Sequence, residues 1–517
     1  MNHIASLVVL ALAVLAVLAC GCASLPPLEA RVKTTALADT SGTRLGRALA
    51  DDAAAHRGRT GIHPLSLPRD AFAARVLLAA IAEKSIDAQY YIWHGDHVGF
   101  LLFQALWNAA ERGVRVRLLL DDLNTKGLDP TLAVLDAHPH LEVRLYNPLV
   151  QRTARLANFV TDFARVNRRM HNKSFTIDNQ VSIVGGRNVG NEYYGAGSGV
   201  AFADLDVIAI GEAVRHVSRQ FDVYWNSASA YPAATFVGTA TGEDRAALDA
   251  RLAATHADPD AAAYLEAVRS APIVRDLVDR RLDFEWTTTS VLHDDPAKTL
   301  DAAGRTDALL FPELVRAIGR PERTLDLVSP YFVPGEEGAA ALAAMARRGV
   351  AVRILTNSLA SSDVTAVHAG YAKRRADLLR AGVRLFELKR TAARIAPDER
   401  QGPSTSSSSA LHAKTFAVDR SRLFVGSFNF DPRSARLNTE MGLLIDSPAL
   451  AGQLADAFDR SAPSVAYEVR LGPDGRSLHW VERTASGEIR HDTEPDTSWS
   501  KRSAVGLLAI LPIEWLL

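Results

Sequence analysis

Two copies of one short pattern, His-x-Lys-x-x-x-x-Asp, carry residue types that could perform substitution at a phosphodiester. The copies are His171, Lys173 and Asp178, and His412, Lys414 and Asp419. Such a substitution needs a nucleophile on one side of phosphorus and a proton donor on the other, and one histidine cannot supply both at once. The lysines would place positive charge where the equatorial oxygens gain negative charge, a task often given to metal ions. The pattern therefore predicts one composite active site that requires no metal and no other cofactor.

An asparagine and an acid follow each copy at similar spacing. Asn188 in GGRN and Asn429 in GSFN both lie 17 residues after their histidine. Glu440 follows the second histidine by 28 residues, and Asp204 lies at about the matching place after the first. We expect the two amides to bind phosphoryl oxygens and the two acids to orient the imidazoles.

The residues after each histidine alternate as in a β-strand, over 173–177 and 414–418. Because strand side chains alternate between faces, each histidine and its lysine, two residues apart, project from the same face. Asp178 and Asp419, although part of the motif, lie at the strand ends. A carboxylate at such a position can hold a turn through hydrogen bonds to the backbone, and we interpret both aspartates first in this way.

The two halves of the chain repeat in the same order beyond the motifs. SIDAQYYIW matches TLDLVSPYFV, and VRVRLLLDD matches VAVRILTNS. The offset stays near 240 residues, since it is 239 from Asp87 to Asp326, 240 from Val143 to Val383 and 241 from His171 to His412. Constant offsets indicate a duplication. Strands that alternate with helices predict an α/β fold of two pseudo-symmetric domains, each with a mixed, largely parallel sheet flanked by helices on both faces. The halves would pack so that the two motifs face each other.

These motifs resemble those of the phospholipase D superfamily. The flanking segments, such as LHAKTFAVDRSRLFVGSFNFDPRSARLNTEMG and the tail EPDTSWSKR...LLAILPIEWLL, resemble bacterial cardiolipin synthases with a lipoprotein-type leader. The similarity covers roughly residues 60–517. It implies transfer of a phosphatidyl group from phosphatidylglycerol or phosphatidylethanolamine to phosphatidylglycerol through a phosphohistidine. By analogy His171 is the nucleophile and His412 the acid and base, although the internal symmetry leaves the reverse assignment open.

Three alternative functions remain open at this point. Water as the acceptor would make the protein a phospholipase D that releases phosphatidic acid. An exported nuclease is disfavoured by the net charge of −1, because proteins that bind nucleic acid usually carry a basic surface. A catalytically silent lipid-binding protein is disfavoured because His, Lys and Asn are intact in both halves. We expect phospholipid membranes as the partner, expect no nucleic acid, and leave an accessory protein open.

The N-terminus reads as an export signal that ends in a lipid-attachment site. An apolar run extends from Ile4 to Cys20, and small residues follow it. Either Cys22 or Cys20 would be the acylated residue. No Lys or Arg precedes Ile4, so an uncleaved membrane anchor is the alternative. Either way we expect a protein tethered in the bacterial cell envelope, with its catalytic domains in the periplasm.

Composition and repeat together predict the domain limits. We expect a leader or anchor at 1–22, a linker at 23–60, a first phospholipase D-like domain at 61–226, a helical insertion at 227–301, and a second such domain at 302–517 with a C-terminal extension. With 517 residues and 48% hydrophobic content, the chain is long enough for two cores. A solvated loop at 403–410, rich in serine, would lead into the second histidine; a gate over the site is the alternative.

Four further features could belong to function or to structure. A basic stretch with apolar residues interleaved either grips anionic head groups at a bilayer or forms a solvated helix face; its arginines are Arg152, Arg155, Arg165, Arg168 and Arg169. The apolar tail at 504–517 is too short to span a membrane, so it is packed into the core or interfacial. Tyr90, Tyr91 and Trp93 would lie partly in the core and partly at the rim of the site. His94 and His97 have metal-ligand spacing, but no third histidine or cysteine accompanies them, so we expect no metal site there.

Overall fold

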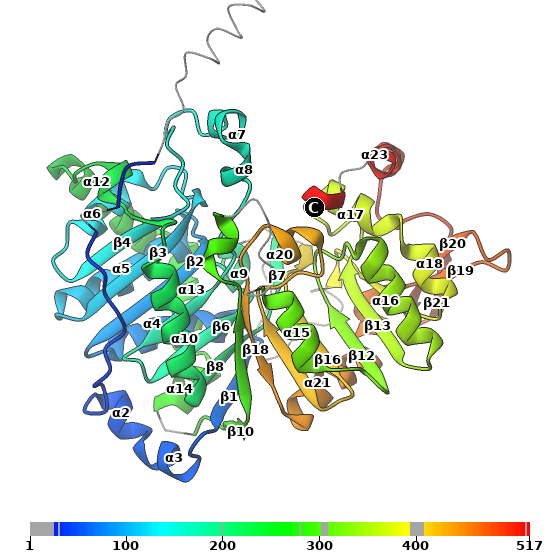
Figure 1. The fold of residues 1–517 in the computed structure, drawn as a ribbon, viewed down its shortest axis with the longest axis horizontal. Coiled ribbons are helices and arrows are strands. Elements are labelled where there is room, and N and C mark those ends of the chain that lie inside the picture. The colour runs from blue at the N-terminus through cyan, green and yellow to red at the C-terminus, as the bar shows by residue number, and fades with distance from the viewer. Residues whose placement is uncertain are drawn as a thin grey trace, which may run out of the picture.

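The protein folds into two large β-sheets, one from each half of the chain, with helices packed around both (Figure 1), and a two-stranded sheet of β7 (Val200–Ala203) and β15 (Ser408–Leu411) joins the halves. The computed structural model describes residues 25–28, 31–197, 200–278, 281–300, 309–392, 408–511 and 514–517. The expected leader, with Cys20 and Cys22, lies outside the described residues. No helix within these ranges is long and apolar enough to cross a membrane.

The first half forms a nine-stranded sheet. Its elements are α2 (Arg44–Ala48), α3 (Ala50–Ala55), β1 (Thr60–Leu65), α4 (Pro68–Ile81), β2 (Ser85–Ile92), α5 (His97–Glu111), β3 (Arg115–Asn124), α6 (Asp129–Asp136), β4 (Leu141–Tyr146), α7 (Ala157–Thr161), α8 (Phe163–Val166), β5 (Ser174–Ile177), β6 (Val181–Gly185), α9 (Asn191–Tyr194), β7 (Val200–Ala203), β8 (Asp206–Gly211), α10 (Glu212–Trp225), β9 (Ala230–Pro232), α11 (Ala234–Val237), α12 (Gly242–Ala257), α13 (Pro259–Arg269), α14 (Pro272–Val278) and β10 (Glu285–Thr287).

The second half forms a ten-stranded sheet. Its elements are β11 (Thr289–His293), the 3₁₀ helix η1 (Pro296–Thr299), α15 (Leu310–Ile318), β12 (Thr324–Val328), α16 (Gly335–Arg347), β13 (Ala351–Asn357), α17 (Thr365–Ala372), α18 (Arg375–Arg380), β14 (Arg384–Leu388), β15 (Ser408–Leu411), β16 (Lys414–Val418), β17 (Arg422–Gly426), α20 (Pro432–Arg436), β18 (Met441–Ile445), α21 (Pro448–Arg460), α22 (Ala462–Val465), β19 (Ala466–Leu471), β20 (Leu478–Thr484), β21 (Gly487–His491), α23 (Trp499–Ile510) and the 3₁₀ helix η3 (Glu514–Leu516).

The order of strands confirms the internal duplication. The first sheet runs β1-β8-β6-β5-β2-β3-β4-β9, and the second runs β11-β18-β17-β16-β12-β13-β14-β19, so eight strands correspond one to one. β10 extends the first sheet at one edge, and β20 and β21 extend the second at the other. β9, β10 and β11 come from the segment 227–301, so the expected helical insertion also supplies edge strands to both sheets.

Both sheets are mixed, as expected, but the prediction that they are largely parallel is wrong. Among the described strands of the two large sheets, only the neighbours β2, β3 and β4, and their counterparts β12, β13 and β14, pair in parallel. Those strands are joined through helices. The strands that carry the motifs, β5 and β16, instead continue through tight hairpins into β6 and β17, and a hairpin connection forces antiparallel pairing.

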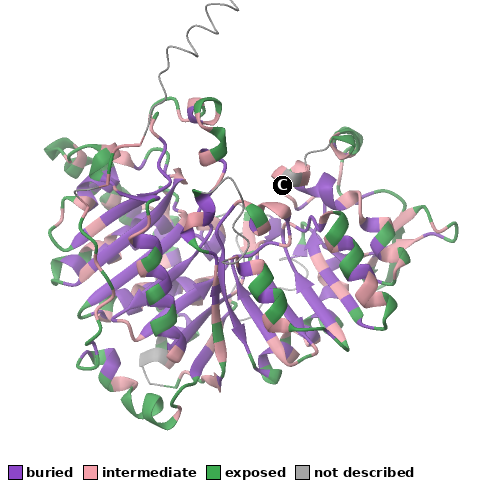
Figure 2. Cartoon of the chain, viewed as in Figure 1, coloured by how far each residue is buried: buried purple, intermediate pink, exposed green. Residues whose placement is uncertain are grey.

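Each sheet is covered on both faces, which explains why its central strands are almost entirely buried (Figure 2). In the first half, Ile208 and Ile210 of β8 join the outer core with α4 and α5. Val207 and Ala209 of the same strand point the other way, into a core shared with α10, α21 and the second sheet. This shared core holds the two halves together and brings their motif-bearing edges to one place.

Candidate active site

Backbone pairings between the two halves place each motif histidine beside an acid from the opposite half. His171 N donates to Thr439 O at 2.9 Å, and Thr439 N donates to Arg169 O at 2.9 Å. In the other direction β7 pairs in parallel with β15, and His412 N donates to Ala203 O at 2.8 Å. The residue after Thr439 is Glu440, and the residue after Ala203 is Asp204.

The resulting histidine–acid pairs are crossed. His171 Nδ1 lies 2.8 Å from Glu440 Oε2, and His412 Nδ1 lies 2.6 Å from Asp204 Oδ2. We expected these acids to orient the imidazoles, but the sequence did not indicate that each acid would serve the histidine of the other half. With Nδ1–H donated to a carboxylate, Nε2 carries the free lone pair that a nucleophile or base requires.

The two motif lysines lie against their own histidines. Lys173 Nζ donates to His171 O at 2.6 Å, and Lys414 Nζ donates to His412 O at 2.5 Å. Lys414 Nζ also lies 3.0 Å from Nδ1 and 3.1 Å from Nε2 of His412. This agrees with the expected alternation, in which residues two apart in a strand share a face.

Burial in the site disfavours the charged forms of both histidines and both lysines. Burial, with the neighbouring Lys173 and Lys414, lowers the pKa of His171 well below its usual value. Burial and Lys414 lower the pKa of His412 to about 4. Burial also holds the pKa of Lys173 far below its usual value and lowers the pKa of Lys414 to about 8. Both imidazoles are therefore neutral at pH 7, and an anionic group placed among these side chains would relieve the unfavourable potential.

The two orienting acids differ in their electrostatics. Burial raises the pKa of Glu440 to about 7, which Lys173 offsets only in part, and Ser427 Oγ donates to its Oε2 at 2.5 Å. Burial acts in the same direction on Asp204, but the charges of His412 and Lys414 outweigh it and hold the pKa of Asp204 below its usual range. The two otherwise similar halves thus present one firmly ionised acid and one that titrates near neutrality.

The side-chain amides of the two asparagines differ in their hydrogen bonds. Asn188 Oδ1 accepts from Ile92 N at 3.2 Å, and its Nδ2 donates to Tyr193 OH at 3.0 Å, which leaves one N–H of the amide available. Asn429 Oδ1 is buried without a hydrogen-bond partner among the described residues. This Oδ1 can accept a hydrogen bond from a ligand, whereas a phosphoryl oxygen would have to be held by the Asn429 Nδ2 amide, which donates.

Asp178 and Asp419 lie at the opposite ends of β5 and β16 from the histidines. The Asp178 carboxylate accepts from the backbone N–H groups of residues 83–85, and the Asp419 carboxylate accepts from those of residues 322–324, which begin β2 and β12. Both aspartates have positive φ, near 50°, as a tight turn requires. The geometry gives them the turn-holding role and places neither with the imidazoles.

Comparison with known proteins identifies the family. Residues 77–225 and 314–462 each match the family described as "Cardiolipin synthase, PLD-like domain". The chain belongs to this cardiolipin synthase family. It is 48% identical over 476 residues to cardiolipin synthase C of Escherichia coli (strain K12), with 92% of this chain and 100% of that protein covered. It is 30% identical to an uncharacterized protein of Helicobacter pylori (strain ATCC 700392 / 26695), with 86% and 87% covered.

The fold resembles that of a solved phosphatidylserine synthase from Haemophilus influenzae. The TM-score is 0.56 at 13% sequence identity, with 92% of this chain and 100% of the other covered. At this identity the likeness supports the two-domain fold alone. In this member of the cardiolipin synthase family, the two matched segments correspond to the two sheets and their motifs.

Aromatic side chains surround the imidazoles. The Tyr91 ring lies 4.8 Å from that of His171, and the rings of Tyr193 and Phe202 lie 5.0 Å and 5.2 Å from that of His412. Tyr90 and Trp93 are buried in the core. The expectation that this tyrosine–tryptophan segment lies partly in the core and partly beside the site is therefore confirmed.

The structure does not bring His94 and His97 together as a metal-binding pair. His94 Nδ1 lies 3.0 Å from Glu192 Oε1, whereas His97 Nε2 lies 3.8 Å from Asp258 Oδ2. His94 and Glu192 do form a cluster with Asp96, whose ligand atoms all lie within 4.8 Å of one another. Both carboxylate oxygens of Asp96 already accept backbone N–H groups, from residues 99 and 191, so this cluster is accounted for by hydrogen bonds of the protein itself.

Sequence reasoning missed two residues that support Glu440. Ser427 lies two residues before Asn429 in the GSFN segment, and the motif itself could have indicated it. Asp294 accepts the Glu440 backbone N–H at 2.8 Å and pairs with Lys298 Nζ at 2.9 Å. Asp294 lies in the segment expected to be a linker, and nothing in its local sequence points to the site.

The serine-rich segment before the second motif is structured at its end. Residues 403–407 lie outside the described residues, but 408–411 form the buried strand β15, paired with β7 of the other half. The expectation of a solvated loop is wrong for these last residues, because their partner strand comes from a distant part of the chain.

Proposed function

We propose that this protein transfers a phosphatidyl group to a hydroxyl of phosphatidylglycerol and so makes cardiolipin, with phosphatidylglycerol or phosphatidylethanolamine as the donor. The observation that carries the proposal is the pair of crossed histidine–acid contacts, which joins two half-sites into one. Two imidazoles, each with its Nδ1 held by a carboxylate, beside two buried lysines, suit a displacement at a phosphodiester in two steps. The relative from E. coli is itself a cardiolipin synthase.

In the first step His171 Nε2 attacks the donor phosphorus and forms an N–P bond while the P–O bond to the leaving alcohol breaks. His412 gives that alcohol a proton. The negative charge of the phosphodiester beside the imidazole would raise the pKa of His412 from about 4 and so supply this proton. Lys173, Lys414 and Asn429 would hold the phosphoryl oxygens, and the remaining N–H of Asn188 could join them.

In the second step a hydroxyl of phosphatidylglycerol attacks the phosphohistidine. His412 takes the proton from that hydroxyl, the new P–O bond forms, and the N–P bond to His171 breaks. Two inversions give net retention at phosphorus. Glu440 and Asp204 would hold the imidazoles and stabilise positive charge on them. Residues Asp178 and Asp419 serve the fold in this scheme.

The competing function is phospholipid hydrolysis, in which water takes the place of the lipid hydroxyl. The imidazoles would serve either acceptor equally, so the acceptor must be identified by experiment. Tethering of the chain to the bacterial envelope by its N-terminal apolar segment, with the catalytic domains in the periplasm, would favour transfer because donor and acceptor share one bilayer.

The deciding experiment incubates the detergent-solubilised full-length protein with isotopically labelled phosphatidylglycerol, with and without phosphatidylethanolamine, and follows the lipids by mass spectrometry. His171→Ala serves as the inactive protein, and His216→Ala, at an exposed position of α10, as the matched control. Labelled cardiolipin from the wild type and His216→Ala alone supports the proposal. Phosphatidic acid without cardiolipin would make the protein a phospholipase D.

A further inference from the structure

Two groups of exposed apolar residues lie on segments at the same edge of the molecule, and Figure 2 colours parts of both segments as exposed. The first group, here the α7 tip, consists of Leu156, Val160 and Phe163, with Leu156 81% exposed. The second, here the α23 tip, consists of Trp499, Leu507, Ile510 and Leu511, with Ile510 79% exposed. In Figure 1 both tips stand at the top of the view, beyond the ends of the sheets. The surface of a soluble protein seldom carries such groups of large apolar side chains unless they contact a partner or a membrane.

Both tips belong to the edge that carries the catalytic histidines. The α7 tip lies in the chain between the end of β4 and His171, and α23 packs on α17, which follows β13. Arg433 connects the two tips. Its guanidinium donates to Asn167 O at 2.6 Å and to Leu516 O at 3.2 Å. Asn167 directly follows α8, and Leu516 follows α23 in the chain. Arg433 lies four residues after Asn429, so the tips flank the active site.

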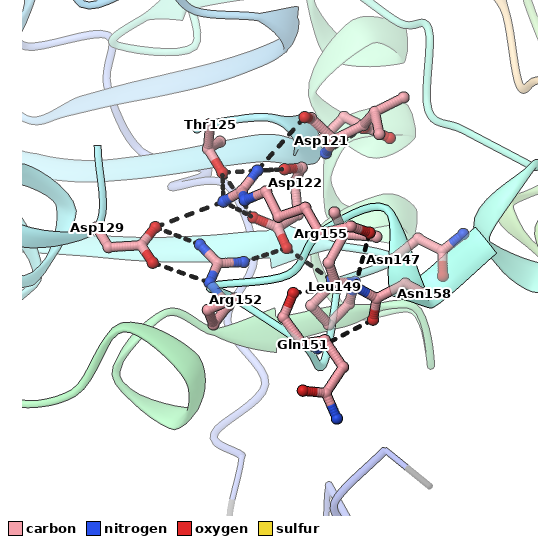
Figure 3. Close-up of polar contacts among 12 residues, drawn as sticks. Asp121, Asp122, Thr125, Asp129, Asn147, Leu149, Gln151, Arg152, Arg155 and Asn158 are labelled. Atoms are coloured by element: carbon pink, nitrogen blue, oxygen red, sulfur yellow. Dashed lines mark hydrogen bonds and ion pairs between the residues drawn. The ribbon is translucent and has the colours of Figure 1, made fainter. Parts of the chain in front are cut away.

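The arginines of the basic stretch are bonded within the protein. Arg152 and Arg155 form ion pairs with Asp122 and Asp129 at the base of the α7 tip (Figure 3). Arg165 Nη1 donates to Asn147 Oδ1 at 2.7 Å, and Arg169 pairs with the fully buried Asp121 at 2.7 Å. These contacts hold the α7 tip in place. Because the arginines are bonded within the protein, the groups that the tip exposes to its surroundings are chiefly its apolar side chains.

The α23 tip is fixed in a comparable way. Val505 of α23 is buried against Leu359 and Ala369, and Lys501 Nζ donates to Leu359 O at 2.6 Å. The opposite side of α23 carries the exposed residues of the tip. The apolar tail thus packs on the protein through one face of α23 and exposes apolar side chains on the other. The sequence had left packing into the core and an interfacial position as alternatives, and α23 combines a packed face with an exposed apolar face.

The N-terminal part of the chain enters the fold beside the α7 tip. The Arg31 guanidinium donates to Asn226 O and Ala230 O, each at 2.7 Å. The neighbouring Ser229 O accepts from Asn147 N at 2.7 Å, and Asn147 in turn donates to Arg165 O of α8 at 2.9 Å. The sequence before residue 31 contains the apolar run from Ile4 to Cys20. A bilayer that held this run would therefore lie close to the α7 tip.

We infer that the α7 and α23 tips dock the catalytic edge onto a phospholipid bilayer. Leucine, isoleucine, phenylalanine and tryptophan side chains enter the boundary between head groups and acyl chains, where an amphipathic tryptophan is especially suited. Because the nearby arginines are paired within the protein, docking depends on apolar insertion and little on anionic lipid or salt. The inference deepens the proposed function, since both lipid substrates would lie in that bilayer.

The test places an environment-sensitive fluorescent amino acid in the full-length protein, reconstituted in phosphatidylcholine vesicles with 20–30% phosphatidylglycerol, about the anionic content at which charge effects are measurable. The probe replaces Val160 or Leu507, and in controls it replaces the exposed Val315 or Ile489. Val315 lies in α15, which leads into the start of β12 and so faces the edge opposite the histidines. Lipids brominated in their acyl chains should quench the fluorescence of the probes at 160 and 507 and leave that of both controls unchanged. The extent of quenching should be the same at low and at high salt.

Substitution supplies an independent measurement. The triple variants Leu156→Ser/Val160→Ser/Phe163→Ser and Trp499→Ser/Leu507→Ser/Ile510→Ser should each lower turnover on vesicles about tenfold, since loss of about 1.4 kcal/mol of apolar insertion corresponds to that factor. Turnover of lipid dispersed in detergent should stay within about twofold of the wild type, and Val315→Ser/Ile489→Ser should behave as wild type on both.

The outcomes separate this inference from the proposed function. Quenching at 160 and 507 without any cardiolipin would support docking and contradict the synthase. Cardiolipin formation without quenching at either position would overturn docking and leave the synthase standing. Quenching that disappears at high salt would replace apolar insertion by binding to anionic head groups and would also overturn the inference.

Discussion

Lys414→Met should stabilise the folded protein while abolishing its activity. Lys414 is 2% exposed, and its pKa is lowered to about 8 because burial disfavours the ammonium more than Asp204 and Glu440 stabilise it. Lowering from 10.5 to about 8 corresponds to about 3 kcal/mol of unfavourable free energy for holding the charge inside the protein. Methionine has a similar length and carries no charge to desolvate, so the variant avoids this cost.

The gain in stability should depend on pH in a defined direction. Below about pH 8 the lysine is protonated in both the folded and the unfolded protein, and the full difference of about 3 kcal/mol is present. Between about pH 8 and the unfolded value of 10.5, the folded protein releases the proton first and the difference shrinks. Above 10.5 both forms are neutral, and wild type and variant should have equal stability.

The assay is urea unfolding of the detergent-solubilised protein at about pH 7, 9 and 11, which samples each of the three pH ranges above. Lys84→Met, at an exposed position, is the matched control. Turnover should fall at least about 100-fold in Lys414→Met, as expected when a charged group that stabilises the transition state is removed, and should be unchanged in the control. A variant that is no more stable than wild type at pH 7, or whose advantage persists at pH 11, would refute the electrostatic reasoning.

Three further predictions follow from the same contacts. Glu440→Gln and Asp204→Asn should each lower kcat about tenfold or more in rapid-quench assays. The reason is that a charge-assisted hydrogen bond to the imidazole becomes a neutral one, which is worth about 1–2 kcal/mol less. A wild-type kcat in either variant would contradict the crossed pairs. In the free enzyme, both imidazoles stay neutral near pH 7, so log kcat/KM should fall below about pH 7 as Glu440 takes up a proton and above about pH 8 as Lys414 loses one. A pH profile of the initial rate will show both falls, and Glu440→Gln should remove the lower one. Asp178→Ala should lower the free energy of unfolding by about 3 kcal/mol, because three hydrogen bonds to backbone N–H groups are lost. The kcat of the folded fraction should stay within about threefold of wild type. A loss of kcat without a loss of stability would instead assign this aspartate to the chemistry.

The sequence by itself determined the features that depend on local pattern and on repetition. The near-constant offset of 240 residues predicted the duplication, and eight corresponding strands confirm it. Alternation along each motif strand placed the histidine and lysine on one face. The turn-holding interpretation of the two motif aspartates could also be made from sequence, because a short carboxylate at a strand end acts on backbone within a few ångströms.

The tertiary structure alone decided which groups meet across the two halves. The contact of His171 with Glu440 joins residues 269 positions apart and depends on the pairing of Arg169 and His171 with Thr439. The contact of His412 with Asp204 depends on the pairing of β7 with β15. Nothing in either strand specifies its partner, since strand pairing is set by the packing of the whole sheet and of the shared core.

The same reason explains what became of the basic stretch. Five arginines near the first motif could be read as a head-group site because a sequence shows charge but does not show which carboxylates lie nearby. The fold brings Asp121, Asp122 and Asp129 to the base of the α7 tip and bonds most of those arginines to them and to backbone groups. Residue types and spacing thus determined the chemistry that the chain can perform, whereas the long-range packing of two sheets determined how the groups are paired and which apolar side chains stay exposed.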